Sequence, residues 1–236
     1  MKILGIESSS LVASVAVVSD DVLTAEYTVN FKKTHSQTLL PMIDEVMRML
    51  EMDLETIDAI AVAGGPGSFT GLRIGSATAK GLGLAIKKPL IHVPTVDAIA
   101  YNLWGSHALI CPIMDARRNQ VYTGLYHMHH GIEIVKQQCA MDMGELIRLL
   151  NEREESVIFL GDGVPVNQNQ IIQEMKVPYE FAPASHNRQR AACVAALGME
   201  YYKKDIKEDA AQFQPNYLRK SQAEREREEK NGQMDE

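Results

Sequence analysis

Residues 61–83, AVAGGPGSFTGLRIGSATAKGLG, contain seven glycines and decide how the first half of the chain folds. The apolar run before them predicts a buried strand that ends at Gly64, and residues 69–86 have helical spacing. A glycine-rich turn between a strand and a helix often holds a phosphate through its backbone amides. The stretch therefore predicts either a nucleotide-binding turn or a turn whose glycines serve packing.

The two phosphate-binding motifs do not match this stretch. A P-loop requires glycine and lysine five and six residues after its first glycine, and no glycine of the turn is followed in this way. Gly65 and Gly67 begin the dinucleotide fingerprint G-x-G-x-x-G, but Thr70 takes the place of its last glycine. The glycines of this turn therefore indicate packing rather than phosphate binding.

Small residues recur every four positions along the predicted helix, at Gly71, Gly75, Ala79 and Gly83. At 3.6 residues per turn they form a slowly winding groove. Glycine in a helix interior costs roughly 1 kcal/mol of helix stability relative to alanine. The glycines of the groove therefore indicate that close packing against another element recovers this stability. We expect another helix to approach it, either from the same chain or from a second subunit.

The order of predicted elements repeats along the chain. Three strands, a helix, a strand and a helix occupy 1–7, 11–19, 22–30, 35–52, 57–64 and 69–86, and the same order follows at 107–115, 120–129, 132–139, 143–152, 156–163 and 165–175. The first strand of each half ends at an acid, Glu7 or Asp115, and the fourth ends in glycine. This pattern predicts two similar α/β lobes, each βββαβα.

Domain boundaries follow from this repeat. The N-terminal lobe is predicted at residues 1–104 and the C-terminal lobe at 105–218. Residues 219–236 have mixed charge and no apolar periodicity, which predicts a flexible tail.

Composition narrows the cellular context. The net charge of −7 disfavours binding of nucleic acid by this chain alone, because phosphate neutralisation dominates such binding. The three cysteines are far apart in sequence, which favours reduced thiols over disulfides or a zinc site. No segment approaches the ~20 apolar residues of a membrane span. We therefore expect a soluble cytoplasmic protein that does not contact a membrane.

The strand-end acids are the candidates for site chemistry. Carboxylates in such positions hold Mg²⁺ near phosphates in nucleotide-cleft proteins, but the turns after them, ESSSLVA and DARRNQV, lack glycine. An ATP site in this chain alone is therefore not favoured. His127 and His129 share one face of a predicted strand, but no metal-binding histidine motif occurs, so no metal is predicted. The candidate contacts to nucleotide or RNA are Glu7, Ser8, Ser9, Asp115, Arg117 and Arg118.

Six segments, taken in order, resemble the TsaB (YeaZ) family, bacterial proteins of tRNA threonylcarbamoyladenosine synthesis. They are ILGIESSSLVASVAVV, THSQTLLPMIDEVM, IAVAGGPGSFTGLRIGSATAKGLG, VPTVDAIA, MDARRNQVYTGLY and PNYLRK. The GGPGSFTGLRIG block is the most specific of them. The resemblance covers most of residues 1–125, returns at 215–220, and is weaker between about 140 and 210.

This resemblance implies an actin-like and Hsp70-like ATPase (ribonuclease H-like) fold. It also implies a non-catalytic partner that activates TsaD, the metal-bearing threonylcarbamoyltransferase, together with the small ATPase TsaE. The reaction modifies the adenosine next to the anticodon of tRNAs that read codons beginning with A. No cofactor is then expected in this chain, since ATP and a metal belong to the partner subunits, and tRNA is contacted through the complex.

The family pairs through helices of its N-terminal lobe, either with TsaD or with itself, so a homodimer is expected when the chain is alone. Placed on this sequence, Gly75→Leu should weaken pairing and leave the monomer folded. The implied interface residues are Leu39, Met42, Ile43, Val46, Gly71, Gly75, Ala79 and Gly83.

Two other functions were weighed against the partner role. A small ATP-dependent kinase or phosphohydrolase of the same fold would turn over Mg-ATP without partners. A peptidase is suggested by an old naming of the family as glycoproteases, but the sequence has no recognisable nucleophile or metal set for it.

Overall fold

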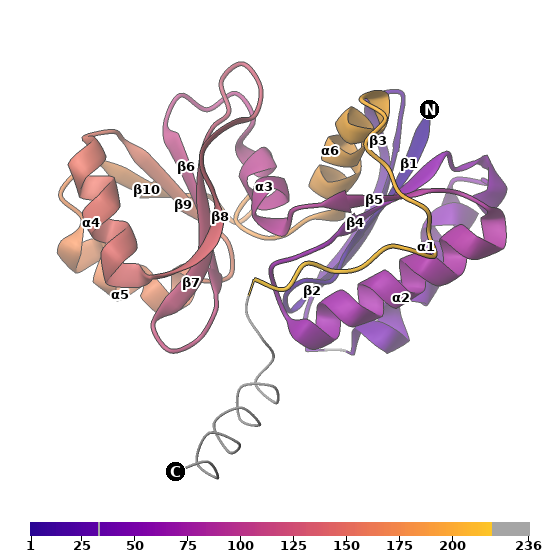
Figure 1. Cartoon of the computed structure of the whole chain (residues 1–236), viewed down its shortest axis with the longest axis horizontal. Helices are drawn as coiled ribbons and strands as arrows, with labels where there is room; N and C mark the ends of the chain where they lie inside the picture. Colours follow the sequence, from indigo (N-terminus) through magenta and orange to yellow (C-terminus); the bar gives the residue numbers. More distant parts are fainter. Residues whose placement is uncertain (33, 219–236) are drawn as a thin grey trace, which may run out of the picture.

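The computed structural model describes residues 1–32 and 34–218, and the tail 219–236 lies outside these residues. Two lobes lie side by side (Figure 1). Each contains one five-stranded mixed sheet, with strand order β3-β2-β1-β4-β5 in the first lobe and β10-β9-β6-β7-β8 in the second. The prediction of two similar α/β lobes is confirmed.

The first lobe is built from the glycine-rich stretch outward. In its sheet β1, β2 and β3 are antiparallel, whereas β1, β4 and β5 are parallel. The predicted helix over 69–86 is confirmed as α2, which begins after Ser68, whose hydroxyl accepts a hydrogen bond from Gly71 N at 3.3 Å. The elements are β1 (Lys2–Glu7), β2 (Val12–Ser19), β3 (Val22–Asn30), α1 (His35–Met49), β4 (Ala59–Ala63), α2 (Phe69–Ile86), β5 (Leu90–Val93) and α3 (Thr95–Ala100).

The second lobe repeats this order. Again three antiparallel strands, β6 to β8, are followed by parallel pairing of β6 with β9 and of β9 with β10. Both lobes extend the predicted βββαβα order by one strand and one helix. The elements are β6 (Leu109–Asp115), β7 (Gln120–His127), β8 (Glu133–Asp142), α4 (Met143–Arg153), β9 (Val157–Leu160), α5 (Val164–Glu174), β10 (Tyr179–Phe181) and α6 (Ala191–Lys203).

Helices cover both faces of the first sheet. On one face α1 and α2 pack on alternate residues of the strands, among them Leu4, Val15 and Ile60. On the other face α6 packs on Ile3 and Ala61. Alternation between the two faces follows the two-residue period of a strand and explains why the inner strands β1, β2 and β4 are largely apolar on both faces.

The helices between the two sheets correct the predicted domain boundaries (Figure 1). Helix α3, predicted within residues 1–104, packs on β6 and β7 of the second sheet. Helix α6, predicted within residues 105–218, packs on β1, β2 and β4 of the first sheet. Each lobe therefore contributes its last helix to the neighbouring sheet, and the lobes do not separate at one point of the chain.

Residues after α6 also belong to the first lobe. Phe213 is buried in the core beneath α1 and α2. Lys80 on α2 donates hydrogen bonds to the carbonyl oxygens of Ala211 (2.8 Å) and Phe213 (3.1 Å). The segment 204–218 thus returns along α2 and ends at the cleft between the lobes.

Candidate functional site

The glycine-rich turn and the start of α2 pack directly on the β1–β2 turn. Ser68 N donates a hydrogen bond to the carbonyl oxygen of Ser9 at 2.6 Å. A Cβ atom at Gly67 would collide with that same oxygen, and one at Gly71 would collide with the carbonyl oxygen of Ser8. Only glycine leaves room for this contact between two backbone segments.

The remaining glycines of the inward stripe also meet the chain itself. A Cβ atom at Gly75 would collide with Oγ of Ser8, and one at Gly83 would lie 3.0 Å from the Cβ of Ala210. The expectation that these glycines admit a second subunit is therefore wrong. They make room for the β1–β2 turn and for the returning C-terminal segment.

The structure contradicts the predicted set of interface residues as a whole. All eight are buried. The apolar positions of α1 face the sheet, and the small positions of α2 face the β1–β2 turn, the core and the returning C-terminal segment. Periodicity identified the inner face of each helix rather than its outer face. The eight buried residues are Leu39, Met42, Ile43, Val46, Gly71, Gly75, Ala79 and Gly83.

The outward face of α2 has a second stripe of small residues, at Ala77, Gly81 and Ala85. A Cβ atom at Gly81 would have no neighbour within 4 Å, so no contact of the described chain requires glycine there. Leu84 beside this stripe is 55% exposed, and Leu40 on α1 is 52% exposed. We call the stripe and these two leucines the outer helix face. The same four-residue spacing marks this stripe in the sequence, where it was missed.

Both strand-end acids close their own turns. Glu7 Oε1 accepts a hydrogen bond from Ser9 N at 2.6 Å, and Asp115 Oδ1 accepts one from Arg117 N at 2.8 Å. In both lobes the donor thus lies two residues after the acid. One backbone amide of each turn, Ser9 N or Arg117 N, is therefore directed at the turn's own carboxylate.

Burial distinguishes the two acids. Glu7 is 1% exposed, and burial raises the pKa of its carboxyl to about 7, with Asp162 of the second lobe adding a smaller upward contribution. Its second oxygen, Oε2, has no hydrogen-bond partner among the described residues. Asp115 is exposed. A magnesium nucleotide, which the fold implies, does not fit this donor set, because Glu7 is buried and each acid already accepts a hydrogen bond from one amide of its own turn.

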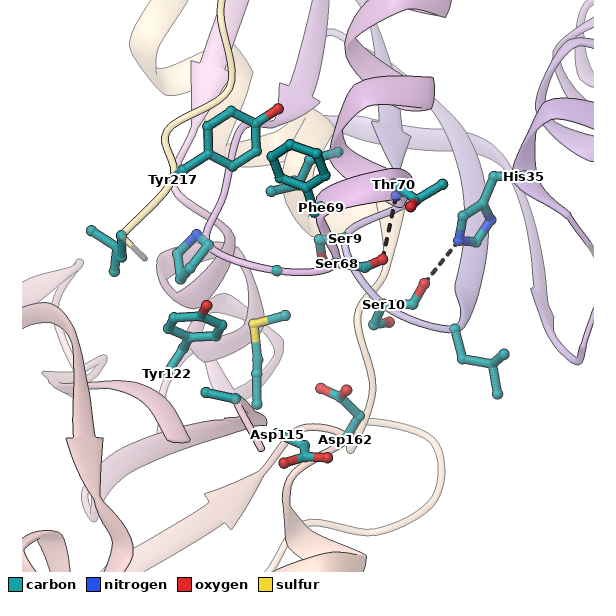
Figure 2. A pocket seen from close by; sticks show the side chains of 18 of the residues that line it. Ser9, Ser10, His35, Ser68, Phe69, Thr70, Asp115, Tyr122, Asp162 and Tyr217 are labelled. Carbon is teal, nitrogen blue, oxygen red and sulfur yellow. Dashed lines mark hydrogen bonds between the residues drawn. The ribbon is translucent and has the colours of Figure 1, made fainter. Parts of the chain in front are cut away.

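A cleft of about 780 Å³ separates the lobes, and it brings together part of the predicted site (Figure 2). Ser9, Asp115 and Arg117 line it, as predicted contacts should, whereas Glu7, Ser8 and Arg118 are not among the residues that line it. Sequence analysis missed the contributions from the β4–α2 turn and the start of α2, from β7, from the β9–α5 turn and from the C-terminal segment. These are Ser68, Phe69, Tyr122, Asp162 and Tyr217, with His35 at the rim.

Three histidines of the second lobe stack on one another, and a fourth lies beside a carboxylate. His129 stacks against His107 and His130, with ring centroids 3.6 and 3.9 Å apart. His127 Nε2 lies 3.3 Å from the carboxylate of Glu155. Within residues 1–32 and 34–218, no three His, Cys, Asp or Glu side chains are placed to hold a metal ion. No helix of these residues is long and apolar enough to span a bilayer.

Two lobes of matching topology around a cleft define the two-lobed fold of actin-like ATPases and sugar kinases. The structure of an Arthrobacter polyphosphate/ATP-glucomannokinase is similar to it, with a TM-score of 0.50 and 11% identity over 86% of this chain and 99% of that chain. YeaZ from Pseudomonas aeruginosa is more similar, with a TM-score of 0.76 and 23% identity over 92% of this chain and 99% of that one.

Sequence relatives identify the family. The model of the TsaD family, described as tRNA N6-adenosine threonylcarbamoyltransferase, matches residues 25–227. A Bacillus subtilis relative, the tRNA threonylcarbamoyladenosine biosynthesis protein TsaB, is 33% identical over 95% of this chain and 96% of its own length. The chain belongs to the TsaB family, and its involvement in threonylcarbamoyladenosine biosynthesis follows from that membership.

Proposed function

We propose that this chain is a non-catalytic partner and activator of a TsaD-type threonylcarbamoyltransferase. The observation that carries the proposal is the self-closure of both strand-end turns, Glu7 to Ser9 and Asp115 to Arg117. Phosphoryl chemistry relies on donors and metal-holding carboxylates that face the transferred group. In this chain each of the two carboxylates already accepts a hydrogen bond from an amide of its own turn.

The outer helix face is the surface on which we propose that the TsaD-type subunit docks. The TsaD family model matches this chain over most of its length, so the partner is expected to have the same pair of helices. Two such pairs can pack closely where side chains are small, as at Ala77, Gly81 and Ala85. Leu84, exposed beside the stripe, and Leu40, exposed on the neighbouring helix α1, supply apolar area for the same contact. A homodimer of the isolated chain would use this face as well.

The proposed division of labour places the chemistry in other subunits. ATP and a metal ion belong to TsaD and to a TsaE-type ATPase, and this chain needs no cofactor of its own. With a net charge of −7 it contacts tRNA through the complex rather than by itself. All of these steps take place in the cytoplasm, where tRNA is modified.

Reconstitution tests the partner role. Threonylcarbamoylation of a tRNA that reads codons beginning with A is measured with TsaD, TsaE and threonylcarbamoyl-adenylate, with and without this chain. We expect modification only when the chain is present, and no Mg-ATP turnover by the chain alone. Modification of equal rate without it contradicts the proposal. Robust turnover by the isolated chain favours the rival function of a small kinase or phosphohydrolase.

A further inference from the structure

The cleft between the lobes has the size and shape of a small-molecule site. Its volume of about 780 Å³ lies within the range of roughly 300–1,000 Å³ in which proteins bind small ligands. Both lobes and the C-terminal segment line it, so its shape depends on the whole fold (Figure 2). The partner role proposed above does not use this cleft.

Aromatic rings form one wall of the cleft. The rings of Phe69 and Tyr217 have centroids 4.9 Å apart, and the guanidinium of Arg73 lies 4.0 Å over the Phe69 ring. Arg73 also donates from Nε to the hydroxyl of Tyr217 at 3.4 Å, which fixes that ring at the mouth. Tyr122 of the other lobe lies below Tyr217 along the same wall (Figure 2). Exposed aromatic faces of this kind stack on planar rings.

Hydrogen-bond acceptors form the floor. The carboxylates of Asp115 and Asp162 lie next to each other there (Figure 2), and Gln189 Nε2 holds Asp162 through a 2.7 Å hydrogen bond. Ser9 lines the opposite side, and its buried hydroxyl has no partner among the described residues. Carboxylates of this kind accept hydrogen bonds from ribose hydroxyls.

The charge of the lining disfavours phosphates. Among the described residues that line the cleft, Arg117 is the only lysine or arginine, and Asp115 and Asp162 oppose it. Two of the turn amides, Ser9 N and Arg117 N, already donate to Glu7 and Asp115. A ligand that stacks and offers hydroxyls, but lacks phosphates, therefore matches the lining better than a nucleotide does.

We propose that the cleft binds an uncharged nucleoside in preference to its phosphorylated forms. The base stacks on the wall formed by Tyr122 and Tyr217. The ribose hydroxyls donate to the carboxylates of Asp115 and Asp162. This inference concerns the isolated chain and is independent of docking to TsaD, so either can fail without the other.

Titration of the full chain tests the proposal, with nuclear magnetic resonance or calorimetry as the readout. The probes are adenosine, guanosine, cytidine and uridine, ATP with and without Mg²⁺, and glucose. We expect saturable binding of at least one nucleoside below about 1 mM, with its 5′-triphosphate at least roughly tenfold weaker. The proposal is overturned if no nucleoside saturates, if the triphosphate binds more tightly, or if glucose alone binds.

Substitutions of lining residues distinguish nucleoside binding in the cleft from nonspecific stacking on an exposed aromatic ring. Tyr217→Leu should weaken nucleoside binding roughly tenfold, because it removes a stacking face. Asp162→Asn keeps the hydrogen bond from Gln189 but removes a negative charge. It should therefore reduce the difference in affinity between the nucleoside and its 5′-triphosphate. Tyr27→Leu, on the exposed edge strand β3, is the matched control and should change nothing. Equal loss in Tyr27→Leu and Tyr217→Leu, with both variants folded by thermal unfolding, contradicts the assignment.

Discussion

The inward and outward faces of α2 carry small residues at the same four-residue spacing but have different surroundings. On the inward face, Gly71 and Gly75 meet the backbone and hydroxyl of Ser8. On the outward face, Gly81 meets nothing within 4 Å. Glycine on the inward face is explained by the packing of the chain itself, whereas glycine on the outward face costs helix stability with no return inside the monomer. This comparison is the reason why the proposed docking surface is placed on the outward face.

The largest expected effect is the loss of stability when a large side chain is placed on the inward face of α2. Gly75→Leu should destabilise the fold by roughly 3 kcal/mol or more, because its side chain must displace the β1–β2 turn. Gly81→Leu is the matched control and should unfold at the same urea concentration as the unchanged chain or at a higher one. This corrects the sequence-based expectation that Gly75→Leu leaves the monomer folded. Equal unfolding midpoints for the two variants would contradict the assignment of faces.

The turn that covers the inward face begins at Glu7, and its stability should depend on pH. Burial raises the pKa of Glu7 from 4.5 to about 7 in the folded state. Between these values the unfolded chain releases a proton that the folded chain retains, so stability falls as pH rises and the loss is complete above about pH 7.

Glu7→Gln should remove this dependence and keep the oxygen that accepts from Ser9 N. From about pH 5.5 to about pH 8 the unchanged chain should lose about 2 kcal/mol more of its unfolding free energy than the variant. Urea unfolding at both values measures the difference. Parallel pH profiles for the two chains would mean that Glu7 is ionised in the fold.

A smaller effect on stability is expected when a single methyl group is added at an outward or a buried glycine of α2. Gly81→Ala should stabilise the chain by roughly 0.5–1 kcal/mol, because alanine is the better helix former and the added methyl meets open space. Gly83→Ala places its methyl 3.0 Å from Ala210 and Leu90 and should lose that gain. Thermal unfolding of the two variants distinguishes them, and a shift of equal size and sign would remove the difference between the faces.

Sequence patterns predicted the local elements well because each has a local cause. Short-range periodicity and turn chemistry are enough to predict the order of strands and helices and the bounds of α2. They also place the acids at the ends of β1 and β6. The exchange of α3 and α6 between the sheets did not follow, because an apolar helix face fits either sheet. The sheet on which each helix packs is decided by contacts between residues far apart in sequence, such as Gly198 against Ala61.

The candidate site was predicted only in part, for a similar reason. Asp115 and Arg117 follow a strand directly, so their place at the cleft could be inferred from topology. Tyr217 comes from the far end of the chain, and only the return of residues 204–218 along α2 brings it there. For the interface, the sequence analysis found only the stripe from Gly71 to Gly83, and four-residue spacing alone does not say whether a stripe faces the chain itself or a partner.

Affinity for a TsaD-type subunit is the most direct test of the claim that the outward face of α2 docks a partner. It is measured for the unchanged chain, for Gly81→Leu, and for Tyr27→Leu as a surface control on β3. The account predicts that Gly81→Leu binds at least roughly tenfold more weakly and supports less tRNA modification, while its thermal stability is unchanged or higher. Unchanged affinity and unchanged modification in Gly81→Leu would contradict it.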